Sequence, residues 1–269
     1  MLGLNPHSGR VHYVERGHGL PVVLLHGFPL DGRIWDAQLA ALSDRFRVIV
    51  PDLPGFGRSS VDQPFTIESL ADDLRQLLIQ IQALPGVLGG LSMGGYVSLA
   101  YITKYPSDLL GLMLIDSRAE ADTPEAKQNR DKMIQTVRAA GAKAIADQML
   151  PKLLAPSADR RRPGVAATLR QIIEACPPRT IEYALAALRD RRDYCGNLPS
   201  IAVPTLIIAG EEDVLTPPAL AHAMAKKIPH ANVAIIPDSG HMTPMEQPDR
   251  VNAAMREFLS HFPQQPPPT

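Results

Sequence analysis

Three residues of the chain have the types and the order needed for nucleophilic catalysis: Ser92, Asp213 and His241. A serine hydroxyl is a poor nucleophile at neutral pH, so it needs a base that takes its proton. The base in turn needs a carboxylate that fixes its tautomer. The chain order serine, acid, histidine is one of the known orders of such triads. These residues therefore predict a catalytic triad of nucleophile, orienting acid and base.

Ser92 is the centre of a G-x-S-x-G pattern at residues 90–94, and the setting of this pattern is informative. It follows an apolar run at 86–91 and opens a segment with helical spacing at 94–105. A serine presented on a sharp turn between strand and helix needs glycine two residues to either side, because larger side chains would collide with both elements. The pentapeptide alone also fits an ordinary turn between a strand and a helix. Its neighbours favour the catalytic interpretation.

The acid of the predicted triad has rivals nearby. Asp213 follows the apolar run 205–209 in a loop that also contains Glu211 and Glu212. The shorter side chain favours Asp213, and the two glutamates remain alternatives. Asp116 is a further alternative, because it ends another apolar run, from which some hydrolases take their acid.

Attack on a carbonyl creates an oxyanion, which backbone N–H groups can stabilise. We expect one N–H from Met93 and a second from Phe28, in the loop 26–29 that follows an apolar run. Pro29 has no N–H and cannot serve. His26, in the same loop, is interpreted as a structural residue that bonds to the backbone.

Several apolar residues lie where they could line a substrate pocket, although core packing would use the same side chains. These residues are Phe28, Leu30, Trp35, Met93, Met149, Leu153, Leu154 and Met242.

Short apolar runs bounded by Gly and Pro alternate with segments of helical spacing. Such runs are typical of strands covered on both faces, and the alternation predicts a mostly parallel sheet with helices on both sides, an α/β fold. The runs lie at 22–25, 48–50, 86–91, 109–115, 205–209 and 233–236.

The stretch 122–195 breaks this alternation, because its helical patterns are interrupted by prolines and contain no convincing strand. We predict a core domain made of 1–121 and 196–262, with 122–195 inserted as a helical cap. The tail 263–269 is rich in proline and is expected to be disordered. Residues 118–192 carry 15 Lys or Arg and 9 Asp or Glu, which we interpret as a solvated helix surface rather than an anion-attracting lid.

Composition narrows the class of partner. A formal net charge of -1 over 269 residues gives no attraction to nucleic acid or to an acidic membrane surface, so a small ester substrate is expected. The N-terminus lacks the pattern of a signal peptide and no apolar run is long enough to span a membrane, which predicts a cytoplasmic protein if no leader precedes it. Cys176 and Cys195 are expected to be free thiols. We expect neither a metal nor another cofactor, and the oligomeric state is left open.

Five segments together resemble the α/β-hydrolase superfamily: 26–28, 51–59, 90–95, 210–213 and 239–241. Within it, the pattern is similar to bacterial carboxylesterases, 3-oxoadipate enol-lactonases and cofactor-free haloperoxidases or perhydrolases. The resemblance implies a sheet of about eight strands, a helical cap after the sixth strand, and ester hydrolysis through an acyl-enzyme.

The function that follows is a carboxylesterase acting on short to medium acyl esters of uncharged alcohols. An enol-lactonase is an alternative; its carboxylated substrate would require a cation in the pocket, such as Arg118, Arg130 or Arg138. A perhydrolase is a second alternative. A relative that only binds small molecules is the alternative outside the enzymes, and the complete triad argues against it.

Overall fold

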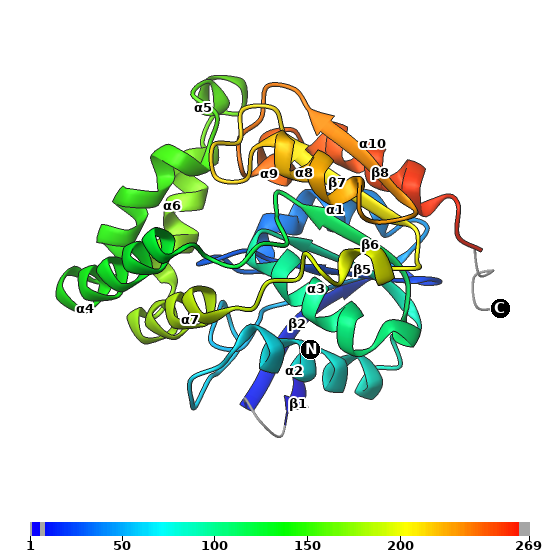
Figure 1. The fold of residues 1–269 in the computed structure, drawn as a ribbon, viewed down its shortest axis with the longest axis horizontal. Coiled ribbons are helices and arrows are strands. Elements are labelled where there is room, and N and C mark those ends of the chain that lie inside the picture. The colour runs from blue at the N-terminus through cyan, green and yellow to red at the C-terminus, as the bar shows by residue number, and fades with distance from the viewer. Residues whose placement is uncertain (1, 6–8, 264–269) are drawn as a thin grey trace.

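The computed structural model describes residues 2–5 and 9–263, and these form a mostly parallel sheet of eight strands in the order β1-β2-β4-β3-β5-β6-β7-β8 (Figure 1). The strands are β1 (Leu2–Asn5), β2 (Gly9–Arg16), β3 (Pro21–Leu25), β4 (Arg47–Pro51), β5 (Gly86–Leu91), β6 (Leu109–Ile115), β7 (Thr205–Gly210) and β8 (Ala231–Ile236). β2 pairs antiparallel with β1 and with β4, and the other neighbouring pairs are parallel. The predicted fold class and strand number are confirmed.

The six apolar runs correspond to β3 through β8, whereas β1 and β2 had no such signal. β2 lies toward the edge of the sheet, so only part of it is covered. Val11 and Tyr13 are buried, and Val14 is exposed. Its buried residues include the polar His12, and Glu15 and Arg16 follow, so β2 has no continuous apolar run.

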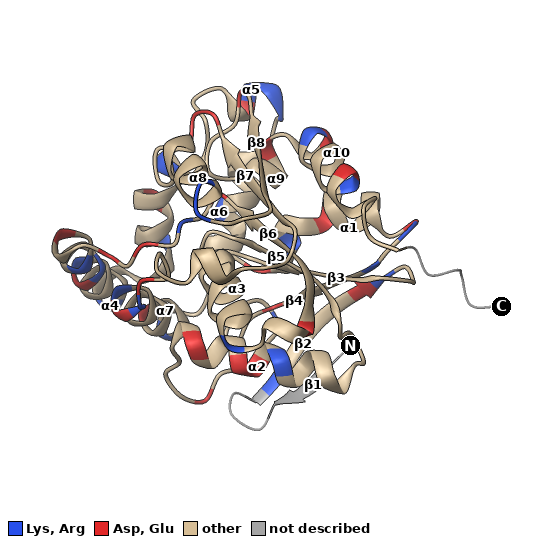
Figure 2. Ribbon diagram, turned by 45° about the vertical axis from the view of Figure 1, so that its right-hand side comes forward, with Lys and Arg blue, Asp and Glu red and all other residues tan. Residues whose placement is uncertain are grey.

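Helices cover both faces of the sheet. The helices of the core are α1 (Asp36–Leu42), α2 (Ile67–Gln80), α3 (Met93–Lys104), α8 (Pro218–Ala225), α9 (Thr243–Glu246) and α10 (Pro248–Leu259), with the 3-10 turns η1 (Gly32–Trp35), η2 (Pro106–Asp108) and η3 (Leu198–Ser200). α1 packs on α10 and α2 packs on α3, and the two pairs lie on opposite sides of the sheet in Figures 1 and 2.

The helical cap lies between β6 and β7, after the sixth strand as expected, and extends away from the sheet in Figure 1. It consists of α4 (Pro124–Leu153), α5 (Ala158–Arg161), α6 (Val165–Ala175) and α7 (Pro178–Asp190). α4 is interrupted at Gly141, whose φ of 71° suits glycine, so its two halves run in different directions. Across the described residues, no helix is both long and apolar enough to cross a membrane.

The limits of the predicted domains stay a prediction, because the fold by itself does not divide the chain at residue 121 or 195. Apart from Pro263, the predicted tail 263–269 lies outside the described residues.

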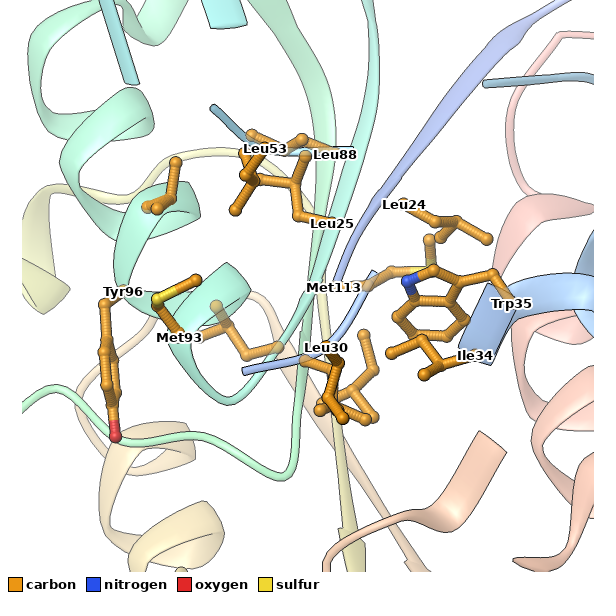
Figure 3. Packing of buried hydrophobic residues seen from close by; sticks show 14 of the residues in the cluster. Leu24, Leu25, Leu30, Ile34, Trp35, Leu53, Leu88, Met93, Tyr96 and Met113 are labelled. Carbon is orange, nitrogen blue, oxygen red and sulfur yellow. The ribbon is translucent and has the colours of Figure 1, made fainter. Parts of the chain in front are cut away.

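The hydrophobic core lies on both faces of the central strands, where Figure 3 shows Leu25 near Leu88 on one side and Leu24 near Trp35 on the other. The three leucine side chains are fully buried, as strands with helices on both faces require. Trp35 packs in the same core, beside Met113 in Figure 3. The carboxyl ends of the parallel strands are thereby held by a rigid core, and the loops that follow them are placed at one edge of the sheet.

Candidate active site

Ser92 lies on a sharp turn between β5 and α3. Its backbone has φ 52° and ψ -111°, a left-handed conformation that is strained for a residue with a side chain. The Ser92 N–H donates to the carbonyl of Ile115 at 2.9 Å, and the Ser92 carbonyl accepts from the Ser117 hydroxyl at 2.9 Å. These bonds to the end of β6 hold the strained turn in place, and Ser92 itself faces a cavity described below.

Gly90 and Gly94 leave the space that this turn requires. A β-carbon on Gly90 would lie 2.2 Å from the carbonyl of Gly94, and one on Gly94 would lie 2.5 Å from the carbonyl oxygen of Leu25. Both contacts are to backbone atoms, which cannot move aside as a flexible side chain can. The two glycines of the sequence pattern are therefore needed for packing.

Asp213 and His241 form a buried hydrogen-bonded pair. Asp213 follows β7, His241 follows β8, and Asp213 Oδ2 lies 2.7 Å from His241 Nδ1. Burial raises the pKa of Asp213, but the charge of His241 and hydrogen bonds from His241 and Thr216 outweigh it and hold the pKa below its ordinary value. Asp213 is thus kept ionised, and a carboxylate in this position sets the tautomer of the imidazole.

Thr216 is a member of this cluster that the sequence did not reveal. Its hydroxyl donates to Asp213 Oδ2 at 2.6 Å and lies 3.2 Å from His241 Nδ1. Asp213 Oδ1 accepts from the N–H groups of Leu215 and Thr216, at 2.8 and 3.0 Å. An Asp followed three residues later by Thr is the only local signal that could have indicated this arrangement.

The rival acids bond elsewhere. Glu211 accepts from the N–H of Asp238, and Glu212 lies 3.9 Å from Arg161. Asp116 accepts from the N–H of Gly210 and from the N–H and hydroxyl of Thr243. Burial and the nearby Asp213 raise the pKa of Asp116 well above its ordinary value.

A cavity of about 540 Å³ brings together Ser92 and His241. Of the other predicted site residues, Phe28, Met93, Met149 and Leu153 line it. Because Nδ1 of His241 faces Asp213, Nε2 is the ring nitrogen left for a proton exchanged with the cavity. The geometry thus joins a hydroxyl, an oriented imidazole and a cavity that opens to solvent.

Four predicted pocket residues do not line this cavity: Leu30, Trp35, Leu154 and Met242. Trp35 and Met242 are fully buried in the core, and Leu154 is half-buried and packs against it. Leu30 lines a second cavity of about 390 Å³ together with Ile172. The prediction was wrong for these residues because apolar side chains beside a site can turn inward, and tertiary packing decides which way each one points.

The two predicted oxyanion donors lie at the wall of the cavity, since Phe28 and Met93 both line it. Met93 is the first residue of α3, and N–H groups in the first turn of a helix have no acceptor within the helix. The N–H of Phe28 is carried by the loop after β3. Stabilisation of an oxyanion by these two groups remains a prediction.

His26 holds the loop that carries Phe28. Its Nε2 accepts from the N–H of Leu53 at 2.9 Å, so the proton of the neutral ring is on Nδ1, which donates to the carbonyl of Gly27 at 2.9 Å. Complete burial lowers the pKa of His26, which favours this neutral form. His26 is a structural residue of the loop, as the sequence interpretation proposed.

Cations line the part of the cavity that the cap supplies. Arg118, Arg130, Lys132 and Lys152 contribute to its wall, and the described residues of the lining include no Asp or Glu. The expectation of a purely solvated helix surface is therefore wrong for Arg130, because the halves of α4 wrap around the cavity and turn part of their charge inward, and for Arg118, which lines the cavity from the segment before α4. Arg138 instead pairs with Glu182, outside the cavity.

Asp122 is the counter-ion of this region, and three arginines share it. Its oxygens lie 2.6 Å from Arg191, 3.0 Å from Arg130 and 3.3 Å from Arg118. One carboxylate cannot neutralise three guanidinium groups, so a surplus of positive charge remains beside the cavity. Nε of Arg118 is buried and has no hydrogen-bond partner among the described residues.

Neither cysteine lines the cavity that contains Ser92. Cys176 and Cys195 are free thiols, and burial raises the pKa of the Cys176 thiol. Within residues 2–5 and 9–263, no three His, Cys, Asp or Glu side chains gather so that they could hold a metal ion.

The chain is similar to known proteins in sequence and in structure. The alpha/beta hydrolase family matches residues 22–254. The AB hydrolase superfamily protein YisY of Bacillus subtilis is 31% identical over 257 residues, which cover 90% of this chain and 92% of that protein. A thermophilic esterase from Thermogutta terrifontis, solved with malate bound, shares 43% identity with a TM-score of 0.93, over 97% of this chain and 98% of that one. The enol-lactonase from Burkholderia xenovorans LB400 shares 26% identity with a TM-score of 0.90, over 97% and 100%.

Proposed function

Because the chain belongs to the alpha/beta hydrolase family, which matches residues 22–254, we propose that it is a carboxylesterase acting on short to medium acyl esters. The single observation that carries this proposal is the buried Asp213–His241 pair, whose imidazole shares one cavity with Ser92. Similarity to an esterase at 43% identity over 97% of the chain supports it.

The reaction proceeds in two halves. His241 takes the proton of the Ser92 hydroxyl as the serine oxygen bonds to the carbonyl carbon, and the N–H groups of Phe28 and Met93 stabilise the oxyanion. The bond from carbon to the alcohol oxygen then breaks, and His241 returns the proton to the departing alcohol. Water attacks the acyl-enzyme by the same steps and releases the acid and free Ser92. Asp213 stabilises the imidazolium throughout.

The test of this proposal measures turnover and labelling together. Purified protein is assayed on p-nitrophenyl acetate, butyrate and octanoate, and is treated with a fluorophosphonate probe that forms a covalent bond with activated serines. We expect turnover on the shorter esters and one label at Ser92, with both lost in S92A. S98A is the matched control, because Ser98 is a buried serine of α3, the helix that follows Ser92, and its hydroxyl bonds to the Gly94 carbonyl at 2.8 Å. Absence of both turnover and labelling in the wild-type protein would overturn the proposal.

A second candidate is hydrolysis of an ester or lactone that carries a carboxylate. The observation that favours it is the cationic wall of the cavity, with Arg118 and Arg130 held beside a single shared carboxylate. Similarity to an enol-lactonase and to an esterase solved with malate bound agrees with this candidate. Both candidates use the same Ser92 chemistry and differ in what the far end of the substrate contacts.

A further inference from the structure

Glu246 is a buried carboxylate that bonds backbone N–H groups from two distant parts of the chain. It is the last residue of α9, and it is 5% exposed. Its Oε1 accepts from the N–H groups of Gly240 and Met242, at 3.0 and 3.1 Å, and its Oε2 accepts from the N–H of Ala155 at 2.8 Å. Both oxygens therefore have donors, as burial of a carboxylate requires.

These donors belong to the two segments that meet at the candidate active site. Gly240 and Met242 are the neighbours of His241, whereas Ala155 follows the end of α4 in the cap. The His241 N–H also donates to the carbonyl of Leu153 at 2.9 Å. A β-carbon on Gly240 would lie 2.6 Å from the Ala155 nitrogen, so the two backbones are in direct contact. Glu246 bridges this contact.

The bridge connects a wall of the cavity to the imidazole. Leu153 lines the cavity that contains Ser92 and His241. The helix that carries Glu246 is itself anchored at its other end, where the Thr243 N–H and hydroxyl donate to Asp116 at 3.2 and 2.6 Å. A movement of the cap segment relative to the His241 loop would have to break the bonds to Glu246.

We propose that Glu246 is a positioning residue that holds the His241 loop and the cap segment 153–155 in one fixed relation. The ring of His241 then keeps its orientation toward Ser92 while Leu153 keeps its place in the cavity wall. Glu246 does not line the cavity, so it acts through His241 and Leu153. This inference rests on the proposed function, because it assumes that His241 is the base.

The variant E246Q tests this role with almost no change of size. An amide has one acceptor oxygen, so its NH₂ must face either the Ala155 N–H or the N–H groups of Gly240 and Met242, and one side of the bridge is lost. We expect kcat on p-nitrophenyl acetate to fall roughly 10- to 100-fold, because a small displacement of a catalytic group is costly, while KM changes by less than about threefold. The pH dependence of kcat should shift as well.

D108N is the matched control for stability. Asp108 is a partly buried carboxylate that accepts from Arg75 Nε at 2.7 Å and from the Tyr101 hydroxyl at 3.1 Å, and it precedes β6 at the opposite edge of the sheet from Ser92. D108N should lower the melting temperature but leave kcat and its pH dependence unchanged. If E246Q loses no more activity than D108N at an equal loss of stability, the inference is wrong.

A spectroscopic readout separates this inference from the proposed function. The proton on His241 Nδ1, hydrogen-bonded to Asp213, is observed by proton NMR far downfield and is assigned by its loss in H241Q. We expect it to broaden or move in E246Q and to stay unchanged in D108N. A wild-type protein with this resonance but no ester turnover would contradict the proposed function alone. An unchanged resonance and unchanged kcat in E246Q would contradict the inference alone.

Hydrogen exchange on the wild-type protein tests the bridge even if E246Q does not fold. The amides of Ala155, Gly240 and Met242 should be protected to a similar degree and should open together, because one carboxylate holds all three. Fast exchange at Ala155 beside strong protection at Gly240 and Met242 would show that the cap segment moves independently and would overturn the inference.

Discussion

Thr216 donates its hydroxyl to Oδ2 of Asp213 at 2.6 Å, and this is the oxygen that faces the imidazole of His241. The threonine oxygen also lies 3.2 Å from His241 Nδ1. One side chain therefore contacts both the acid and the proposed base. The hydrogen bond from the Thr216 hydroxyl helps to lower the pKa of Asp213, and the fold of the loop after β7 places the two side chains together.

The variant T216V keeps the branched shape of the side chain and removes this hydroxyl. We expect kcat/KM to fall by roughly 3- to 30-fold and the free energy of unfolding to fall by about 1 kcal/mol, the usual size of a lost hydrogen bond. T216S keeps the hydroxyl and should remain close to the wild type. Equal activity of T216V and T216S on p-nitrophenyl butyrate would show that the hydroxyl has no role.

Replacement of each candidate acid by its amide distinguishes Asp213 from Asp116. D213N should lower kcat by about 10⁴, the order seen when a triad acid becomes an amide, because the imidazole takes the wrong tautomer. D116N should lower kcat by less than about tenfold, since Asp116 bonds to Thr243 and Gly210. Steady-state kinetics on one short ester is sufficient, and the reverse ranking would identify Asp116 as the acid.

The raised pKa of Asp116 predicts a particular pH dependence of stability. Burial, reinforced by the charge of Asp213, raises this pKa well above its ordinary value of 3.8. Folding therefore favours the protonated form, and the resulting contribution to stability is complete below pH 3.8 and is lost as the pH rises through the raised pKa.

Urea unfolding of wild type and D116N between about pH 4 and pH 8 measures this effect. Because asparagine does not ionise, the free energy of unfolding of the wild type minus that of D116N should decrease as the pH rises. A difference that stays constant, or that increases with pH, would show that Asp116 is ionised in the folded protein at all of these values.

Removal of one cation from the cavity wall distinguishes neutral from carboxylated substrates. R118Q should raise KM for mono-p-nitrophenyl glutarate about tenfold and leave KM for p-nitrophenyl butyrate within about twofold, because only the first ester carries a charge. Added salt should weaken binding of the charged ester in the wild type. R138Q is the control, since Arg138 pairs with Glu182 outside the cavity. Equal effects of R118Q on both esters would exclude a role of Arg118 in selecting charge.

Loss of the shared counter-ion should destabilise the cap. The side chain of Asp122 is fully buried, and that of Arg191 is 1% exposed, so D122N leaves a buried guanidinium without its charged partner. We expect the free energy of unfolding to fall by about 3 kcal/mol, as for other broken buried pairs. D131N is the comparison, because Asp131 is an exposed partner of Arg189 and should contribute little. Similar thermal stability of D122N and the wild type would contradict this account.

Patterns local in the chain predicted much of the fold. The apolar runs that became β3 through β8 were recognisable because strands covered on both faces need continuous apolar residues. The turn at Ser92 was recognisable because Gly90 and Gly94 stand two residues to either side of the serine, between an apolar run and a segment of helical spacing. β1 and β2 carried no such pattern, since β2 has an exposed residue, Val14, next to buried ones.

The residues around the site depended on contacts between distant segments. Thr216 and Glu246 were not predicted members of the site. Thr216 lies beside His241, which is 25 residues away in another loop, and Glu246 bonds Ala155 of the cap, 91 residues away. Trp35 and Met242 were expected in the pocket and are instead buried in the core. An apolar side chain has the same chemistry in both places, so only packing decides between them.

The sequence by itself determined six of the strands, β3 through β8, the turn that presents Ser92 and the identity of the residues able to form a triad, because each follows from residue types at short spacing. The tertiary structure alone decided that Asp213 rather than Asp116 contacts His241, that arginines of the cap face the cavity, and that Glu246 joins the cap to the His241 loop. These features depend on the directions of side chains from segments that are far apart in the chain, by 28 residues for Asp213 and His241 and by 91 for Glu246 and Ala155. Spacing along the chain carries no information about such directions.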